Sequence, residues 1–213
     1  MHRFILTLAL IMFVGLFADA AHAASRSSKE TAAYQRVDID GLQIWLYQKP
    51  IVISHYKAKG VTVPIKVLYE VRSDETDPHN FAVRIAPFLV MMTDELQVEI
   101  CGTFARDKNG YYGMRVTTGG AKAACPITDS VPYGFTDAKR DIHTHVEVER
   151  YLPTQYDKAF LAGTYGPGDH VRTFAYAYSP NDYSIPNSYL ATSRWVRFVG
   201  ETRDSEVVLA TFD

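Results

Sequence analysis

Apolar side chains recur at every second position in several separate stretches of the chain. The strictest run comprises Val61, Val63, Ile65, Val67, Tyr69 and Val71. Alternate residues of a β-strand point to opposite faces of a sheet, so such a run predicts a strand with one buried face. Tyr and Phe also cluster late in the chain, which is typical of strand-rich proteins. These patterns indicate a chain that is rich in β-strands.

The same alternation places one more strand at residues 96–104. Ile100 and Phe104 share its apolar face, whereas Glu99 and Cys101 share the opposite face. An Asn109-Gly110 pair then predicts a tight hairpin turn. Further strands are expected at residues 111–118, 139–148, 173–178, 189–199 and 206–212. The segment 189–199 could form a hairpin that bends at Ser193-Arg194.

Two segments indicate helices. Asp77-Pro78 is a good helix start, with a capping residue followed by proline at the first helical position, and the segment continues to Met92. Pro87 is expected to bend or break that helix. Residues 154–162 predict a second, short helix ended by Gly163. The segments therefore predict both helices and strands, as in an α+β fold.

Residues 34–75 predict a small N-terminal β-element, a hairpin or meander with a turn at Asp40-Gly41. Pro64 suggests that its last strand has an edge position, because proline cannot donate a ladder hydrogen bond. The 213 residues fit one domain with such an extension. We therefore divide the mature chain into this element and a main domain over residues 76–213.

The N-terminus has the pattern of a secretory signal peptide. Arg3 precedes an apolar run from Phe4 to Phe17, and Ala21-His22-Ala23 supplies the small residues of a cleavage site. The run is shorter than the roughly 20 residues of a membrane span. We predict a signal peptide over residues 1–23, a flexible polar leader over 24–33, and a periplasmic or secreted mature chain without a membrane span.

The two cysteines, Cys101 and Cys125, have a meaning in that compartment. An oxidising environment favours a disulfide between them. The alternative is that Cys101 is a metal ligand or nucleophile, although no Cys-His spacing supports it. The formal net charge is −2 and no basic patch stands out. A nucleic-acid partner therefore has no support.

The candidate functional residues begin with His143 and His145. Two positions apart on a strand, their imidazoles would share one face and could close on a single metal ion. A catalytic zinc takes three protein ligands and leaves one position open for water. The candidates for the third ligand are Glu147, Asp169, His170 and Asp182. Asp141 is either a residue that orients a histidine or a solvated strand end.

The order of these residues resembles the JAMM (MPN-type) metalloprotease family. That family carries a glutamate on a strand, then His-x-His, then Ser-x-x-Asp. This chain has Glu99 followed closely by Gly102, then His143-Thr144-His145, then Ser179-Pro180-Asn181-Asp182, over roughly residues 78–200.

The resemblance implies a role for each of these residues. His143, His145 and Asp182 would bind Zn²⁺, Glu99 would be the general base, and Ser179 would help to bind the oxyanion. It also implies a JAMM-like mixed sheet packed with helices in an α/β/α-like arrangement. The partner would be a peptide or protein substrate.

Two departures from the family pattern concern the third ligand. Val146 stands where the family has proline, and the 33 residues of 146–178 separate His145 from Ser179, where the family has about seven. This insertion could form a lid or a wall over the site. It leaves Asp169 or His170 as alternatives to Asp182.

Three functions remain open from the sequence. The first is an exported zinc peptidase or isopeptidase in which Glu99 activates water. The second is a non-catalytic JAMM-like binding or scaffold module. The third is a metal-dependent amidase that acts on a non-protein amide, such as one in cell-wall peptide. These residues also have non-functional interpretations. Glu99 could be a solvated surface residue, and Ser179 to Asp182 could form an ordinary turn.

Overall fold

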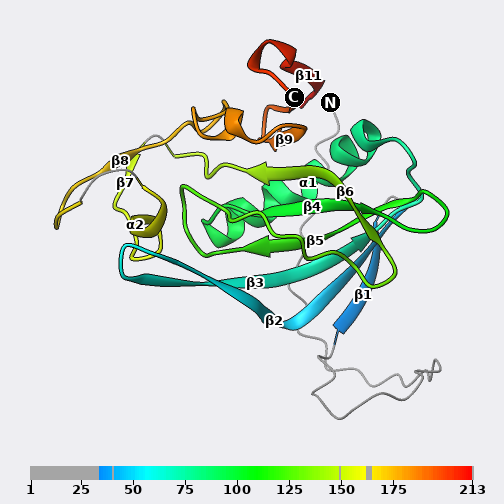
Figure 1. Ribbon diagram of the computed structural model, residues 1–213, viewed down its shortest axis with the longest axis horizontal. Coiled ribbons are helices and arrows are strands. Elements are labelled where there is room, and N and C mark those ends of the chain that lie inside the picture. The colour runs from blue at the N-terminus through cyan, green and yellow to red at the C-terminus, as the bar shows by residue number, and fades with distance from the viewer. Residues whose placement is uncertain (1–33, 40, 149, 162–164, 213) are drawn as a thin grey trace, which may run out of the picture. The chain divides into compact units, whose positions relative to one another are not determined.

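A nine-stranded β-sheet forms the framework of the chain in the computed structural model (Figure 1), which describes residues 34–39, 41–148, 150–161 and 165–212. The strand order is β1-β2-β3-β5-β4-β6-β9-β10-β11. Neighbouring strands are antiparallel except for the parallel pair β6 and β9. The strands are β1 (Tyr34–Ile39), β2 (Leu42–Ala58), β3 (Val61–Arg72), β4 (Cys101–Arg106), β5 (Tyr112–Thr118), β6 (Thr136–Thr144), β9 (Ser188–Ala191), β10 (Trp195–Val199) and β11 (Val207–Thr211). The predicted signal peptide and leader lie outside the described residues.

The segment expected as an N-terminal β-element forms the meander β1-β2-β3. It is continuous with the main sheet, because β3 pairs with β5 from Lys66 to Arg72. The turn into β2 contains Gly41, whose φ of 78° suits a residue without a side chain. Pro64 lies in the part of β3 that precedes this pairing, opposite His55 of β2. The edge position predicted for Pro64 therefore holds locally, within a strand that is interior further along.

Helix α1 (Pro78–Leu96) lies across one face of the sheet (Figure 1). Asp77 caps it, since its carboxylate accepts a 2.8 Å hydrogen bond from the Asn80 N–H. The buried side of α1 packs on the apolar faces of β4, β6 and β9, and this core includes Phe81, Ile85, Leu89, Ile100, Phe104, Ile142 and Tyr189. The alternating apolar residues of these strands are thus the ones that face the helix.

A break at Pro87, one of its two expected effects, and the predicted start of the next strand are both wrong. Pro87 does not break the helix, because its ring is exposed and the buried residues on both sides of it keep α1 on the sheet. The strand predicted from residue 96 starts only at Cys101. Residues up to Leu96 belong to α1, which ends at Gln97 in the left-handed conformation with φ 55°.

The α+β fold class expected from the sequence is also wrong. The chain is a sheet-dominated fold with 43% strand and 17% helix, rather than a JAMM-like α+β domain. Outside α1, the described α-helical structure is the single turn α2 (Asp157–Phe160), shorter than the helix predicted at 154–162. Too little helix forms to cover both faces of so large a sheet. Loops and a hairpin cover the face opposite α1.

The segment 146–178 contains little regular structure. Its strands are the two-residue ribbon β7 (Arg150–Tyr151) and β8 (Val171–Arg172). The strand predicted at 173–178 is absent from this described stretch, since the Ala177 N–H donates to the Phe174 carbonyl in a turn. By contrast, β9 and β10 form the predicted hairpin, and β11 matches the predicted last strand.

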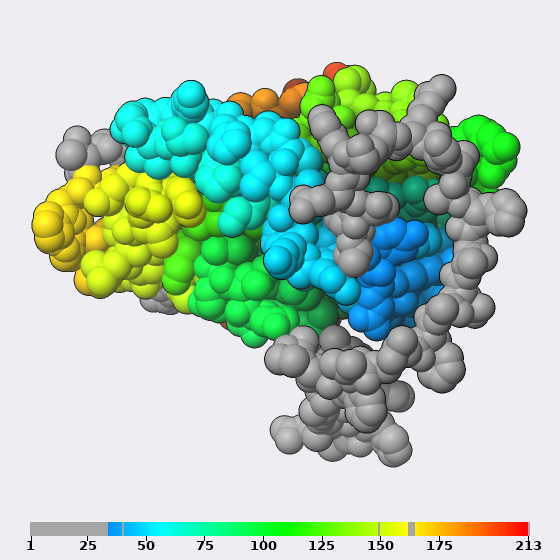
Figure 2. Space-filling model, turned by 90° about the horizontal axis from the view of Figure 1, so that it is seen from below, coloured from blue at the N-terminus to red at the C-terminus, as the bar shows by residue number. Residues whose placement is uncertain are grey.

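The β2–β3 hairpin extends as a long arm towards α2. Near its far end, Tyr56 stacks on Phe160 with ring centroids 4.9 Å apart. Val63 and Ile65 of the arm are buried against Ala159. Figure 2 shows this packing, with the cyan arm against the yellow segment around α2. The arm therefore supports the segment that borders the candidate site.

Candidate metal centre

Strand β6 brings the two histidines to the face of the sheet opposite α1. It lies between β4 and β9, with His143 opposite Cys101 on one side and Leu190 on the other. β6 ends at Thr144, so His145 is the first residue after the strand. Both imidazoles are nevertheless buried, at 5% and 7% exposure, with ring centroids 5.1 Å apart. The shared face predicted from their spacing is present.

Asp182 reaches these histidines from the short 3-10 helix η1 (Asp182–Ser184). Its Oδ2 atom lies 3.3 Å from His145 Nε2 and 3.7 Å from His143 Nε2. One possible ligand atom from each of the three residues lies within 4.8 Å of the others, so the group could hold a metal ion. Although 33 residues separate His145 from Ser179 in the sequence, the chain returns to the histidines.

The alternative ligands are engaged elsewhere. The Asp169 carboxylate accepts a 2.7 Å bond from the Gly166 N–H within its own turn. His170 Nδ1 lies 3.1 Å from the Gly168 carbonyl, and the Glu147 carboxylate accepts from Ser193. Among the described residues, Asp182 is the one that joins the histidine pair.

Turn chemistry at Ser179 to Asp182 positions the carboxylate. The Ser179 N–H donates to Asp182 Oδ2 at 2.6 Å, and the Asp182 N–H donates to Ser179 Oγ at 3.4 Å. Ser179 to Asp182 therefore form a turn, and Asp182 can still be a metal ligand. The two interpretations are compatible because the turn itself holds the Asp182 side chain. A serine hydroxyl that accepts one hydrogen bond still has a proton to donate.

The nitrogen atoms of both histidines fit a metal. His143 Nε2 is buried and has no hydrogen-bond partner among the described residues. His145 Nδ1 lies 2.9 Å from the Phe174 carbonyl, which can only accept. The ring proton of neutral His145 therefore sits on Nδ1, and the lone pair of Nε2 faces Asp182. A backbone carbonyl in this position is a common support for a metal-binding histidine.

Glu99 lies beside this group, immediately before β4. Its Oε1 atom is 4.0 Å from His145 Nε2, and the residue is 7% exposed. Two backbone contacts hold it there, since its N–H donates to the Ala121 carbonyl at 2.9 Å and its carbonyl accepts from Thr118 Oγ1 at 2.8 Å. The interpretation of Glu99 as a solvated surface residue is wrong.

The ionisation of these groups reflects burial and close packing. Burial raises the pKa of Glu99 to about 8, against the lowering effect of His145. For His145, burial lowers the pKa, but hydrogen bonding to Asp182 and the nearby charge of Glu99 raise it to about 9. Burial opposes ionisation of Asp182 as well, yet both histidines hold its pKa far below the usual range. Protons and a metal would therefore compete for the same atoms.

Asp141 is not a solvated strand end. It is 5% exposed and lies on the same face of β6 as His143, and its carboxylate accepts a 2.7 Å hydrogen bond from Ser188 of β9. Burial raises its pKa to about 6, although the Ser188 hydroxyl and His143 both act to lower it. A buried carboxylate two residues before a ligand suits a role in holding β6 and its histidine in place.

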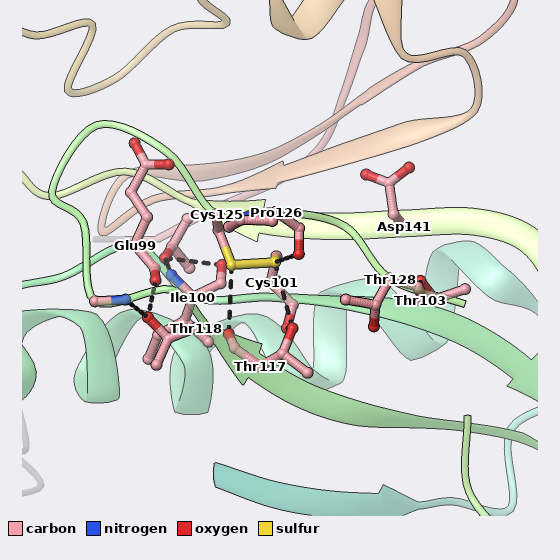
Figure 3. Close-up of a disulfide and its surroundings, with 12 residues drawn as sticks. Glu99, Ile100, Cys101, Thr103, Thr117, Thr118, Cys125, Pro126, Thr128 and Asp141 are labelled. Carbon is pink, nitrogen blue, oxygen red and sulfur yellow. Dashed lines mark hydrogen bonds between the residues drawn. A yellow bond between two sulfur atoms is a disulfide. The ribbon is translucent and has the colours of Figure 1, made fainter. Parts of the chain in front are cut away.

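A disulfide between Cys101 and Cys125 borders the site (Figure 3). The two Cα atoms are 5.8 Å apart. The bond ties the loop after β5 to β4, on the same side of the strands as Glu99 and Asp141 (Figure 3). No role as a metal ligand is left for Cys101.

The metal group lies in a cavity of about 470 Å³. Glu99, His143, His145, Ser179 and Asp182 form its polar end. The rest of the wall is largely apolar and comes from the disulfide loop, from the end of α2 and from the segment around η1, including Ile127, Phe160, Leu161, Phe174, Pro180 and Ile185. The insertion 146–178 thus forms part of the cavity wall, which is one of the two roles predicted for it, a lid or a wall.

Comparisons with protein-family models, with curated proteins and with solved structures give no match to this chain. Within the described residues, no helix is long and apolar enough to cross a membrane.

Proposed function

We propose that this chain is an exported zinc-dependent hydrolase of amide bonds, a peptidase or isopeptidase. One observation carries the proposal. A buried glutamate, Glu99, lies beside a group of two histidines and one aspartate at the polar end of a cavity. A general base next to three metal ligands and room for a substrate are what metal-assisted hydrolysis needs.

His143, His145 and Asp182 would hold the metal. Two imidazoles and a carboxylate are typical ligands of a catalytic zinc, which keeps a further position open. When bound, zinc supplies a Lewis acid that polarises the substrate carbonyl and lowers the pKa of water. The unpartnered His143 Nε2 supports a metal here, since a buried nitrogen without a partner is costly.

The chain's own residues would handle the protons and the developing charge. Glu99 accepts the proton of the attacking water and passes it to the leaving amine. Ser179 lines the cavity and its hydroxyl would donate to the oxyanion. The Phe174 carbonyl and the Ser179 N–H keep His145 and Asp182 in their orientations.

Export and the family resemblance belong to the proposal as well. A disulfide is typical of proteins in oxidising compartments, which agrees with the signal-peptide pattern of residues 1–23. The JAMM resemblance rests on the order and roles of the site residues alone, since the fold is sheet-dominated. The amide could be in a protein or in cell-wall peptide.

Zinc content and cleavage test this function. We expect one zinc per chain in the purified wild type by mass spectrometry of the metal, and less than one tenth of that in His143→Ala. Digestion of a peptide library and of cell-wall peptides, followed by mass spectrometry, should reveal the cleaved amide. Glu99→Gln keeps the shape of the side chain and all three ligands, so it should bind zinc and cleave at least about 100-fold more slowly.

The control is Glu147→Gln, a carboxylate near the histidines in sequence that bonds Ser193 instead. It should keep both zinc and activity. Wild type without zinc, or Glu99→Gln with wild-type activity, would contradict the proposal. Zinc in the wild type without cleavage of any amide would favour the non-catalytic binding module.

A further inference from the structure

Two cationic residues line the cavity besides the candidate metal group. The carboxylates of the cavity, Glu99 and Asp182, are both at the metal end, whereas Lys122 and Arg172 line the rest of the wall. The Lys122 ammonium lies over the Tyr151 ring, 5.7 Å from its centroid. Neither cation forms an ion pair with a carboxylate of the described residues. A ligand in this cavity would therefore meet two cations that no carboxylate of the described residues pairs with.

Three carboxylates of the neighbouring described segments, Asp157, Asp169 and Glu147, accept hydrogen bonds from neutral groups. Asp157 is buried and accepts from the backbone of Lys122 and Ala123 and from Thr154. Asp169 and Glu147 are held by the Gly166 and Ser193 contacts described above. None of these three carboxylates forms an ion pair with Lys122 or Arg172.

The β7–β8 ribbon adds a second observation about Arg172. Arg150 and Arg172 are register partners across its two antiparallel strands. Like charges directly opposite each other destabilise a strand pair. Both side chains are exposed, and an anion bound by Arg172 from the cavity would offset this repulsion, because arginine binds carboxylates through two parallel hydrogen bonds. Tyr151 and Val171, the other residues of the ribbon, are buried and hold it in place.

We propose that the cavity selects amide substrates that carry a carboxylate close to the scissile bond, bound by Arg172 and Lys122. The volume of about 470 Å³ suits a side chain or short peptide segment rather than a folded domain. The backbone of Lys122 is fixed by Asp157 at 2.6 Å, so its position is built into the fold. The substrate class rests on the proposed hydrolase function, but binding of the carboxylate does not require turnover.

Peptide binding to zinc-loaded Glu99→Gln tests this selectivity without cleavage. The probes are two fluorescent hexapeptides that differ by one central residue, glutamate or glutamine, each with a free or an amidated C-terminus. We expect fluorescence anisotropy at fixed ionic strength to give about fivefold to tenfold tighter binding when a carboxylate is present. Comparison of the four peptides shows whether a side-chain or a terminal carboxylate is preferred.

Arg172→Gln, made in the same background, should bring acidic and neutral peptides to within about twofold of each other, and Arg172→Lys should restore part of the difference. Arg150→Gln is the matched control, because Arg150 has the same charge on the partner strand but does not line the cavity. It should keep most of the preference.

Equal affinity for acidic and neutral peptides, or no loss of the preference in Arg172→Gln, would overturn the inference and leave the hydrolase function standing. Selective binding without any cleavage by the wild type would overturn the hydrolase function alone.

Discussion

His145 couples metal binding to pH at the level of a single residue. Its pKa of about 9 in the metal-free site means that the imidazole carries a proton at neutral pH. Burial lowers the pKa of His145, whereas the hydrogen bond to the Asp182 carboxylate and the interaction with Glu99 raise it. A metal can bind only the neutral ring, so each metal ion bound must displace this proton.

Zinc affinity should therefore rise with pH, by about tenfold per unit between pH 6 and pH 8, and should level off only near pH 9. The sign follows from the raised pKa, because below it the protonated ring is the dominant state. Competition with a chromophoric chelator at pH 6, 7 and 8 measures the slope. In Glu99→Gln one of the stabilising charges is gone, so the rise should level off at a lower pH. An affinity that is constant from pH 6 to pH 8 would show that His145 is not protonated in the metal-free site.

Much of the site follows from residue spacing, and part of it does not. The alternation around β6 correctly places His143 and His145 on one face, and the alternation around residues 96–104 places Glu99 opposite the core. The Phe174 carbonyl has no signal in the sequence, because any residue offers a backbone carbonyl and only the tertiary path brings this one to His145. The choice of Asp182 over Asp169 likewise depends on where an irregular segment returns.

At the level of the element, Asp157 is the residue that shapes the wall of the cavity. Its carboxylate accepts five hydrogen bonds, from the backbone N–H groups of Lys122, Ala123 and Thr154 and from the hydroxyls of Tyr151 and Thr154. It is completely buried in α2. These bonds tie the disulfide loop to the single helical turn that carries Phe160.

Asp157→Asn should destabilise the protein by about 2–4 kcal/mol, because the new NH₂ group would face donors where the carboxylate accepted. Urea unfolding measures the loss, and hydrogen exchange should show faster exchange in residues 121–124 with zinc binding retained. Asp169→Asn is the matched control, since that carboxylate also accepts a backbone N–H but in an exposed turn. It should cost less than about 1 kcal/mol. Equal effects of the two substitutions would contradict the role of Asp157.

Elements with strong local signals were predictable, and those stabilised by tertiary contacts were not. The Asp77-Pro78 helix start, the Asn109-Gly110 hairpin and the last three strands are present as expected. The sequence did not predict that α1 continues beyond Pro87 to Leu96. It does so because burial of the helix on the sheet outweighs one lost hydrogen bond. The 173–178 segment alternates like a strand, yet it has aromatic contacts instead of a strand partner. Tyr176, for example, accepts from the Trp195 indole through its carbonyl.

In the part of the chain that the structure describes, the core and the candidate site occupy opposite faces of one sheet. The apolar strand residues and α1 stabilise one face, whereas buried polar residues such as Asp141 and Thr117 crowd the other. Loops cover this polar face, and loops alone bury little apolar surface. The β2–β3 arm contributes by packing on α2 from outside. One role of the N-terminal strands is thus to support the wall of the cavity.

The disulfide is the covalent link between this cover and the sheet. It closes a loop of 24 residues between Cys101, in the buried face of β4, and Cys125, on the cavity wall. In the chain-entropy model a loop of this length is worth about 3 kcal/mol. Removal of the bond should lower the stability of the whole domain. It should also loosen the loop that carries Lys122 and Ile127, because the bond ties that loop to β4.

The paired substitution Cys101→Ala/Cys125→Ala should lower the Tm by roughly 6–12 °C, as expected for about 3 kcal/mol in a domain of this size. It should also weaken binding of the acidic hexapeptide, whose proposed cation Lys122 lies in the freed loop, while the zinc ligands stay on β6 and η1. Calorimetry with and without a reducing agent separates the bond from the packing of the two side chains, since reduced wild type keeps both sulfur atoms. If reduced wild type melts at the same temperature as the oxidised protein, the bond does not hold the cover on the sheet. In that case Asp157 and the arm would have to do so alone.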